Sequence, residues 1–193
     1  MRGAKWVLLW LCAVGWAATA RGQLYDLIPE GETLELPFTY TQDFILVEME
    51  LYGKVPLQFI FDTGAENTVI FDKVFLDIFS VEYDMTIPII GSDFLGGNQA
   101  QVARRIPFVI HNSVEAEMDV LVLEEYNGAL KTFLGTEVNG ILGSSFFRHF
   151  LVEIDYKKEK IILSRDRKRF DKKKKSYKVL PLEIHRNKPY VQA

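Results

Sequence analysis

Apolar and polar side chains alternate along much of the chain after residue 33, and this period-two pattern predicts β-strands. Residues 45–51 alternate apolar with acidic side chains, and a Gly53-Lys54 turn leads into a second apolar run at 55–61. The same pattern predicts further strands at 68–71, 86–90, 101–110, 116–123, 151–155 and 160–163. We therefore expect a mostly β, closed barrel made of many short strands.

Helical spacing is confined to two short segments. Residues 72–79 place their apolar side chains on one side, and Asp72 is the expected N-cap. Residues 144–150 have the composition of a short capped helix. Residues 126–137 are weakly patterned and are interpreted as a loop. One or two short helices are therefore expected beside a β core.

The first predicted hairpin delivers an aspartate onto a tight turn, in the run Phe61-Asp62-Thr63-Gly64-Ala65. A carboxylate at the end of a buried strand is costly unless it is hydrogen-bonded or used chemically. Gly64 allows the chain to double back because it has no Cβ, and Thr63 offers a hydroxyl at the same bend. Asp and Gly are common in ordinary turns, so a plain turn is the competing interpretation. The downstream run Ile141-Leu142-Gly143 favours a functional site instead.

Two of the predicted strands, 86–90 and 101–110, flank a polar, glycine-rich stretch and predict a long hairpin. The tip of this hairpin contains Gly91, Ser92, Asp93, Gly96 and Gly97. Two roles fit such a tip, namely a mobile surface loop or a flap that covers a bound substrate. Phosphate binding is not expected, because no Gly-Lys-Ser/Thr motif follows the glycines.

The chain begins with basic residues, continues with an apolar block at 6–18 and reaches small residues before residue 23. These are the three parts of a secretory signal peptide, which we assign to residues 1–22. The apolar block is shorter than the roughly 20 residues that a membrane-spanning helix needs, so an uncleaved anchor is the poorer interpretation. Cleavage after Ala20 and cleavage after Gly22 both fit. The mature protein is expected to be exported, either periplasmic or extracellular.

Metal and thiol chemistry find little support in the sequence. The only cysteine, Cys12, lies in the expected leader, so the mature chain has no disulfide and no thiol nucleophile. His111, His149 and His185 are far apart and lack the paired spacing of a metal site. No metal and no cofactor are therefore expected.

The net charge of −3 conceals a densely basic stretch at 165–178. This stretch joins two apolar patterns and has few interleaved aromatic residues, so we interpret it as a solvated linker and expect no nucleic-acid partner. Residues 179–193 repeat the Leu-Pro-apolar pattern of residues 36–38 and predict the incomplete start of a second lobe. The remaining expected units are a lead-in with a first strand at 23–43 and a main domain at 44–164.

The order of these features resembles that of the retropepsin-like aspartic proteases. The resemblance rests on an apolar strand ending in Asp62-Thr63-Gly64-Ala65, a later flap-like hairpin, and Gly140-Ile141-Leu142-Gly143 before a short helix. It spans roughly residues 44–163 and is closest to exported bacterial members of the gag-polyprotein aspartyl protease type. Three residues alone are a weak motif, but the combination is moderately specific.

The resemblance implies a role for each matching residue. Asp62 would be the catalytic aspartate, and Thr63 would join two lobes beneath the site through its hydroxyl. Gly64 would bring backbone close to the aspartates, and Ala65 completes the motif. Ile141, Leu142 and Gly143 would pass behind the aspartate loop and support it. The glycine-rich hairpin tip would be a flap over an extended peptide substrate.

Aspartic protease chemistry needs two carboxylates that share one proton, and this chain has a single Asp-Thr-Gly. Asp155 is followed by a basic turn and is interpreted as a turn residue. The second aspartate would therefore come from a homodimer partner or from a second lobe, of which we prefer the latter. Ala65 lacks the hydroxyl often found at this position in pepsin-like enzymes, so activity is expected at mildly acidic to near-neutral pH. The alternative function is a non-catalytic, exported peptide-binding or scaffold module.

Overall fold

The computed structural model describes residues 26, 28–89, 99–111, 114–124, 126, 128–168, 178–185 and 188–191. The expected leader at 1–22 and most of the basic stretch at 165–178 lie outside the described residues. The elements are β1 (Thr33–Pro37), β2 (Thr39–Thr41), β3 (Phe44–Leu51), β4 (Val55–Phe61), β5 (Thr68–Ile70), α2 (Val74–Asp77), β6 (Met85–Pro88), β7 (Gln99–Ile110), β8 (Val114–Leu123), α3 (Ala129–Leu134), β9 (Gly140–Leu142), α4 (Ser144–Phe147), β10 (Leu151–Asp155), β11 (Lys160–Ser164), β12 (Glu183–His185) and β13 (Lys188–Tyr190).

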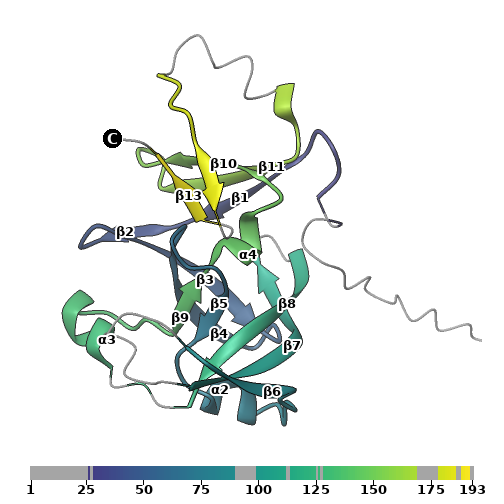
Figure 1. Ribbon diagram of the computed structural model, residues 1–193, viewed down its shortest axis with the longest axis vertical. Coiled ribbons are helices and arrows are strands. Elements are labelled where there is room, and N and C mark those ends of the chain that lie inside the picture. Colours follow the sequence, from purple (N-terminus) through teal and green to yellow (C-terminus); the bar gives the residue numbers. More distant parts are fainter. Residues whose placement is uncertain are drawn as a thin grey trace, which may run out of the picture.

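Six strands close into a barrel (Figure 1), which confirms the predicted fold class. Hydrogen bonding runs in the order β3-β4-β9-β5-β8-β7, and the pairing of Leu51 with Phe108 joins β3 to β7 and closes the ring. β2 and β6 extend the sheet outside the ring, on β3 and β7 respectively. Two neighbouring pairs are parallel, β4 with β9 and β5 with β8. Closure leaves few free strand edges, which protects a small β-protein from edge-to-edge association.

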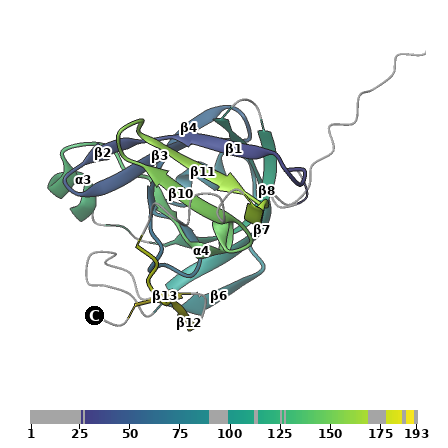
Figure 2. The same ribbon diagram turned by 90° about the horizontal axis from the view of Figure 1, so that it is seen from above.

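A second sheet of three antiparallel strands, in the order β1-β11-β10, covers one end of the barrel (Figure 2). Leu34 and Leu36 of β1 pair with Leu163 and Ile161 of β11, and all four side chains are buried. Outside this pairing, Glu35 forms an ion pair with Lys160 at 2.7 Å. β1, in the expected lead-in, is therefore packed against a strand near residue 160.

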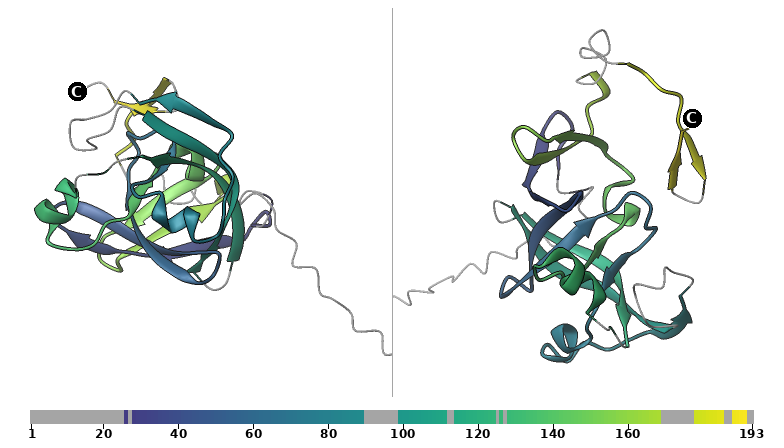
Figure 3. Two further views of the ribbon diagram at one scale, coloured as in Figure 1. Left: turned by 90° about the horizontal axis from the view of Figure 1, so that it is seen from below. Right: turned by 90° about the vertical axis from the view of Figure 1, so that its left-hand side faces the viewer.

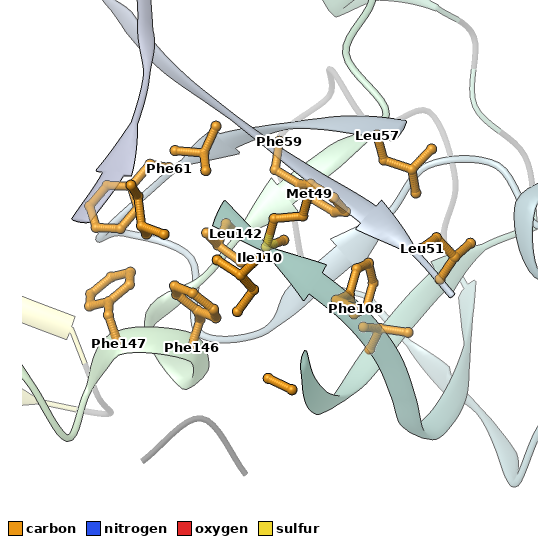
Figure 4. Packing of buried hydrophobic residues seen from close by; sticks show 14 of the residues in the cluster. Met49, Leu51, Leu57, Phe59, Phe61, Phe108, Ile110, Leu142, Phe146 and Phe147 are labelled. Atoms are coloured by element: carbon orange, nitrogen blue, oxygen red, sulfur yellow. The ribbon is translucent and has the colours of Figure 1, made fainter. Parts of the chain in front are cut away.

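The barrel interior is filled with aromatic and aliphatic side chains (Figure 4). Phe59 and Phe108 are fully buried and meet edge to face, with ring centroids 5.9 Å apart. Phe147 of α4 lies against Phe61 at the end of β4, with centroids 4.6 Å apart. Burial of each such side chain contributes roughly 1.5–3 kcal/mol, so α4 is fixed firmly against the end of β4.

The predicted strands are present, whereas the helices differ in detail. The segment interpreted as a loop contains α3, whose Leu130 and Leu134 are buried and lie one helical turn apart. Gly128 and Gly135 flank α3 with φ of 71° and 68°, and these glycine boundaries were the signal for a short helix. α2 is a single turn, shorter than the predicted 72–79, although the Asp72 carboxylate does accept the Val74 N–H at 2.9 Å.

The C-terminal hairpin, β12 with β13, stands away from the barrel in the right-hand view of Figure 3. Its large apolar side chains are exposed, with 64% of Ile184 and 51% of Tyr190 accessible. The assignment of residues 179–193 to a second lobe stays a prediction. Within the described residues, none of the helices has the length and apolar character needed to cross a bilayer.

Candidate active site

Asp62 directly follows β4, at a point where β4 and β5 meet β9, a strand from a distant part of the sequence. β9 lies between β4 and β5, which are the strands before and after the aspartate loop (residues 62–67). Phe61 is in parallel register with Leu142, and the Asp62 N–H donates to the Leu142 carbonyl at 3.1 Å. The backbone at Asp62 is therefore fixed by β9, independently of the contacts of its side chain.

Two glycines allow β9 to come this close. A Cβ on Gly140 would lie 2.7 Å from Cε1 of Phe59, and one on Gly143 would lie 2.6 Å from the carbonyl carbon of Asn67. Gly143 has φ of −85° and ψ of 177°, an extended backbone that any residue adopts. Close approach, not unusual dihedral angles, therefore excludes larger residues at Gly143.

α4 holds the far side of the aspartate loop. The N–H groups of Ser144 and Ser145 donate to the carbonyls of Ala65 and Glu66, at 2.8 and 3.0 Å. Ser144 Oγ, in a side chain that is 2% exposed, also donates to the Glu66 carbonyl at 3.3 Å. The first N–H groups of a helix lack partners within the helix. Here the loop supplies those partners, whereas the sequence predicted a cap within residues 144–150.

The Asp62 carboxylate points back over its own turn. Asp62 Oδ1 accepts the Gly64 N–H at 2.7 Å, and within the described part of the chain no other hydrogen bond to this carboxylate is found. Asp62 and Ala65 are half-buried, while Thr63 and Gly64 are exposed. The second carboxylate oxygen and the Thr63 hydroxyl are thus available to a group outside this part of the chain.

Asn139 is a structural residue that sequence reasoning did not identify. Its side-chain Oδ1 accepts the Gln58 N–H at 2.8 Å, and its backbone N–H donates to the Gln58 carbonyl at 2.8 Å. Its carbonyl accepts the Phe71 N–H, also at 2.8 Å. Asn139 therefore connects the middle of β4 to the residue that follows β5, just before β9 begins. Its place directly before Gly140 was the available signal.

The second acidic candidate, Asp155, is a turn residue as predicted. Its Oδ1 accepts the N–H groups of Lys157 and Lys158, each at 3.1 Å, in the turn between β10 and β11. The Lys158 ammonium lies 3.7 Å from Oδ2 of Asp155. The structure records no hydrogen bond between Asp155 and Asp62 in the part of the chain that it describes.

The predicted long hairpin is formed by β6 and β7, which pair from Met85 with Val102 to Pro88 with Gln99. The candidate flap residues at its tip, Gly91, Ser92, Asp93, Gly96 and Gly97, lie outside the described residues. Among the residues that are described, no group of three or more His, Cys, Asp or Glu side chains could hold a metal ion.

Comparisons with known proteins show a likeness to solved structures. A search of solved structures finds a retropepsin-like aspartic protease from Rickettsia conorii, at 19% sequence identity and a TM-score of 0.44, covering 68% of this chain and 91% of that chain. A scan against protein-family models gives no match, and a search of curated proteins gives none either. At this level of similarity no activity transfers, so the residues around Asp62 must carry any functional assignment.

Proposed function

We propose that this chain is one lobe of an aspartic endopeptidase, with Asp62 as one of two carboxylates that activate a water molecule. The observation that carries the proposal is the construction around Asp62. Backbone contacts from β9 and α4, with glycines at the closest approaches, hold a strand-end aspartate whose turn stays exposed. A simple surface turn needs no such support from distant segments.

The chemistry follows from pairing two such carboxylates. Two carboxyl groups a few ångströms apart do not both ionise readily, so the pair holds one proton. The ionised member removes a proton from water, and the protonated member polarises the carbonyl of the scissile peptide bond. The apparent pKa values of such a pair belong to both groups together. Peptides or proteins are the substrates, and no cofactor is involved.

The second aspartate has to approach the exposed turn formed by Asp62, Thr63 and Gly64. A second copy of the chain would present the same turn across a two-fold axis, and a second lobe would present a similar one. In both arrangements the exposed Thr63 hydroxyl lies where the two halves meet. The expected leader at residues 1–22 would place the activity in the periplasm or outside the cell.

Mixing wild-type protein with the Asp62→Asn variant distinguishes these arrangements. At constant total concentration, a site shared by two copies gives peptide hydrolysis that follows the square of the wild-type fraction. A site completed within one polypeptide gives hydrolysis that is linear in that fraction. The native mass of the mixture, measured by light scattering, provides the independent check. Absence of hydrolysis in wild-type protein of every measured mass contradicts the endopeptidase proposal.

A non-catalytic peptide-binding module is the second candidate, and the single Asp-Thr-Gly in the sequence favours it. Binding to a peptide library separates the two functions. An endopeptidase loses turnover in the Asp62→Asn variant while it still binds peptide. A binding module shows the same affinity for both proteins, and neither cleaves the peptide.

A further inference from the structure

A cleft of about 320 Å³ lies between α4 and the β7–β8 hairpin, next to the aspartate loop. Its walls carry the side chains of Arg105, Arg148 and Glu117, and Met118 and Phe146 add apolar surface. Figure 1 shows α4 beside the upper part of this hairpin. The cleft thus combines cationic groups with an apolar surface at the edge of the proposed active site.

A β-bulge places Arg105 in this cleft. Ala103 pairs with Val120 and Ile106 pairs with Met118, so Arg104 and Arg105 together face Asp119. Arg105 has φ of 52°, a left-handed conformation that is unfavourable for a residue with a side chain. The Asp119 carboxylate stabilises it by accepting the Arg105 N–H at 3.0 Å. Bulges re-aim side chains, and here the bulge directs Arg105 to the cleft.

The two arginines of the bulge differ in how their charges are satisfied. Arg104 forms ion pairs with Asp84 and with Asp119, the latter at 3.6 Å. The Arg105 guanidinium forms no ion pair within the described residues, although it lies on the cleft wall. Asp119 is occupied by Arg104 and by the Arg105 backbone. Of the two arginines, Arg105, which has the strained backbone, is therefore the one whose guanidinium has no ion pair within the described residues.

Arg148, just after α4, provides a second cation on the opposite wall. Its Nε donates to Nε2 of His149 at 3.0 Å, and the remaining guanidinium N–H groups have no ion pair among the described residues. Glu117 is the one acidic lining group without a partner in the same set. The lining carries two arginines and two carboxylates, Glu117 and Asp119, but Asp119 is already paired with Arg104. The two arginines then face Glu117 alone, which suits a carboxylate ligand because guanidinium groups bind carboxylates through paired hydrogen bonds.

The aspartate loop itself forms part of the cleft. Asn67, its last residue, lines the cleft, and so does Ser145, whose N–H donates to the Glu66 carbonyl of the loop. The cleft therefore adjoins the loop that carries Asp62. We infer that this cleft binds an acidic side chain of the peptide substrate, to one side of the scissile bond. This inference rests on the proposed function only in identifying the ligand as a substrate.

The test measures binding separately from hydrolysis. Fluorescein-labelled peptides of about ten residues, each with one Glu at a different position, are compared with their Gln counterparts by anisotropy on full-length Asp62→Asn protein. We expect Glu to strengthen binding about three- to tenfold at one position, the size of one or two partly exposed charge-assisted hydrogen bonds. The Arg105→Gln and Arg148→Gln variants should each lose most of this preference.

Arg167→Gln is the matched control, because Arg167 is an exposed arginine that does not line the cleft. Arg148→Glu is a second variant, which should reverse the preference and favour Lys over Gln at the same position. Absence of any Glu preference, or an equal loss in the Arg167→Gln control, overturns the inference. A Glu preference without hydrolysis by wild-type protein supports the cleft and contradicts the endopeptidase. Hydrolysis by wild-type protein without a Glu preference supports the endopeptidase and contradicts the acidic side-chain site in the cleft.

Discussion

Asp62 and Asp155 both stand at the end of a β-strand, yet the structure holds them in opposite ways. Asp155 is satisfied locally, since its carboxylate accepts two N–H groups from the turn that follows it. Among the described residues Asp62 accepts only the Gly64 N–H, and its loop is held by β9 and α4, which lie about 80 residues further along the chain. The hydrogen bonds of Asp155 stabilise its own turn, whereas the contacts from β9 and α4 fix the place of Asp62 in the fold.

The difference separates the aspartate that we propose as catalytic from an aspartate that stabilises its own turn. In Asp155 both oxygens are engaged locally, because Oδ1 accepts two turn N–H groups and Oδ2 lies 3.7 Å from the Lys158 ammonium. In contrast, the backbone contacts around Asp62 fix the loop while leaving one carboxylate oxygen uncommitted in the described part of the chain. Such preorganisation is what a group that must meet a second carboxylate requires.

Exchanging each aspartate for asparagine gives the largest expected difference. Asp62→Asn should lower kcat for peptide hydrolysis by about 10²–10⁴-fold, the usual contribution of a general acid or base. Asp155→Asn should leave kcat within about twofold, because an amide oxygen still accepts the two turn N–H groups. Initial rates at matched protein concentration measure both effects. A similar loss in the two variants would contradict the distinction between them.

The glycines at the closest approaches offer a second comparison, in stability. Gly143→Ala forces a Cβ into the Asn67 backbone and should cost about 3 kcal/mol or more, because both segments are fixed. Gly135→Ala at the end of α3 meets no neighbouring atom and should cost about 1 kcal/mol, for its left-handed φ of 68° alone. Urea unfolding measures both, and a smaller loss for Gly143→Ala would show that the loop can move.

The sequence was sufficient for most of the fold because alternation is a local signal. The hairpin from β3 to β4 and the pair β10 with β11 appear where the pattern predicted them. The sequence pattern did not predict α3, because six residues between two glycines are too few to show helical periodicity. The closure of the barrel through Leu51 and Phe108 depends on non-local pairing, which no local pattern contains.

The site was predictable only in part. The run Asp62-Thr63-Gly64 and the second run at 141–143 could be connected because they resemble a known combination. The hydrogen bonds of Ser144 to the loop and the bulge at Arg105 could not be found, because both depend on three-dimensional packing between segments distant in sequence. The residues that hold a site in place are therefore harder to predict from sequence than the residue at its centre.

Substitution of Ala65 tests how hydrogen bonding to the Asp62 carboxylate affects the pH dependence of hydrolysis. A serine at position 65 would place a hydroxyl within the aspartate loop, where a hydrogen bond to the Asp62 carboxylate would favour its ionised form. The acidic limb of the pH–rate profile should then move down by about one pH unit. Ala65→Cys is the control, because a thiol of similar size donates only weakly. Equal profiles for the two variants would exclude this hydrogen bond, and a wild-type optimum well below the ordinary carboxyl range would contradict the expected mildly acidic to near-neutral activity.

Two buried serines provide the smallest and most specific comparison of the two regions. Ser144, 2% exposed, donates to the Glu66 carbonyl of the aspartate loop, whereas Ser164, 3% exposed, accepts the Asp166 N–H at the end of β11. Each serine-to-alanine change should cost about 0.5–1.5 kcal/mol, the net value of one hydrogen bond. Only Ser144→Ala should also lower kcat, by a few-fold with KM unchanged, because the loop position affects the transition state more than peptide binding. If Ser164→Ala lowers kcat equally at the same loss of stability, Ser144 acts through stability alone and has no positioning role.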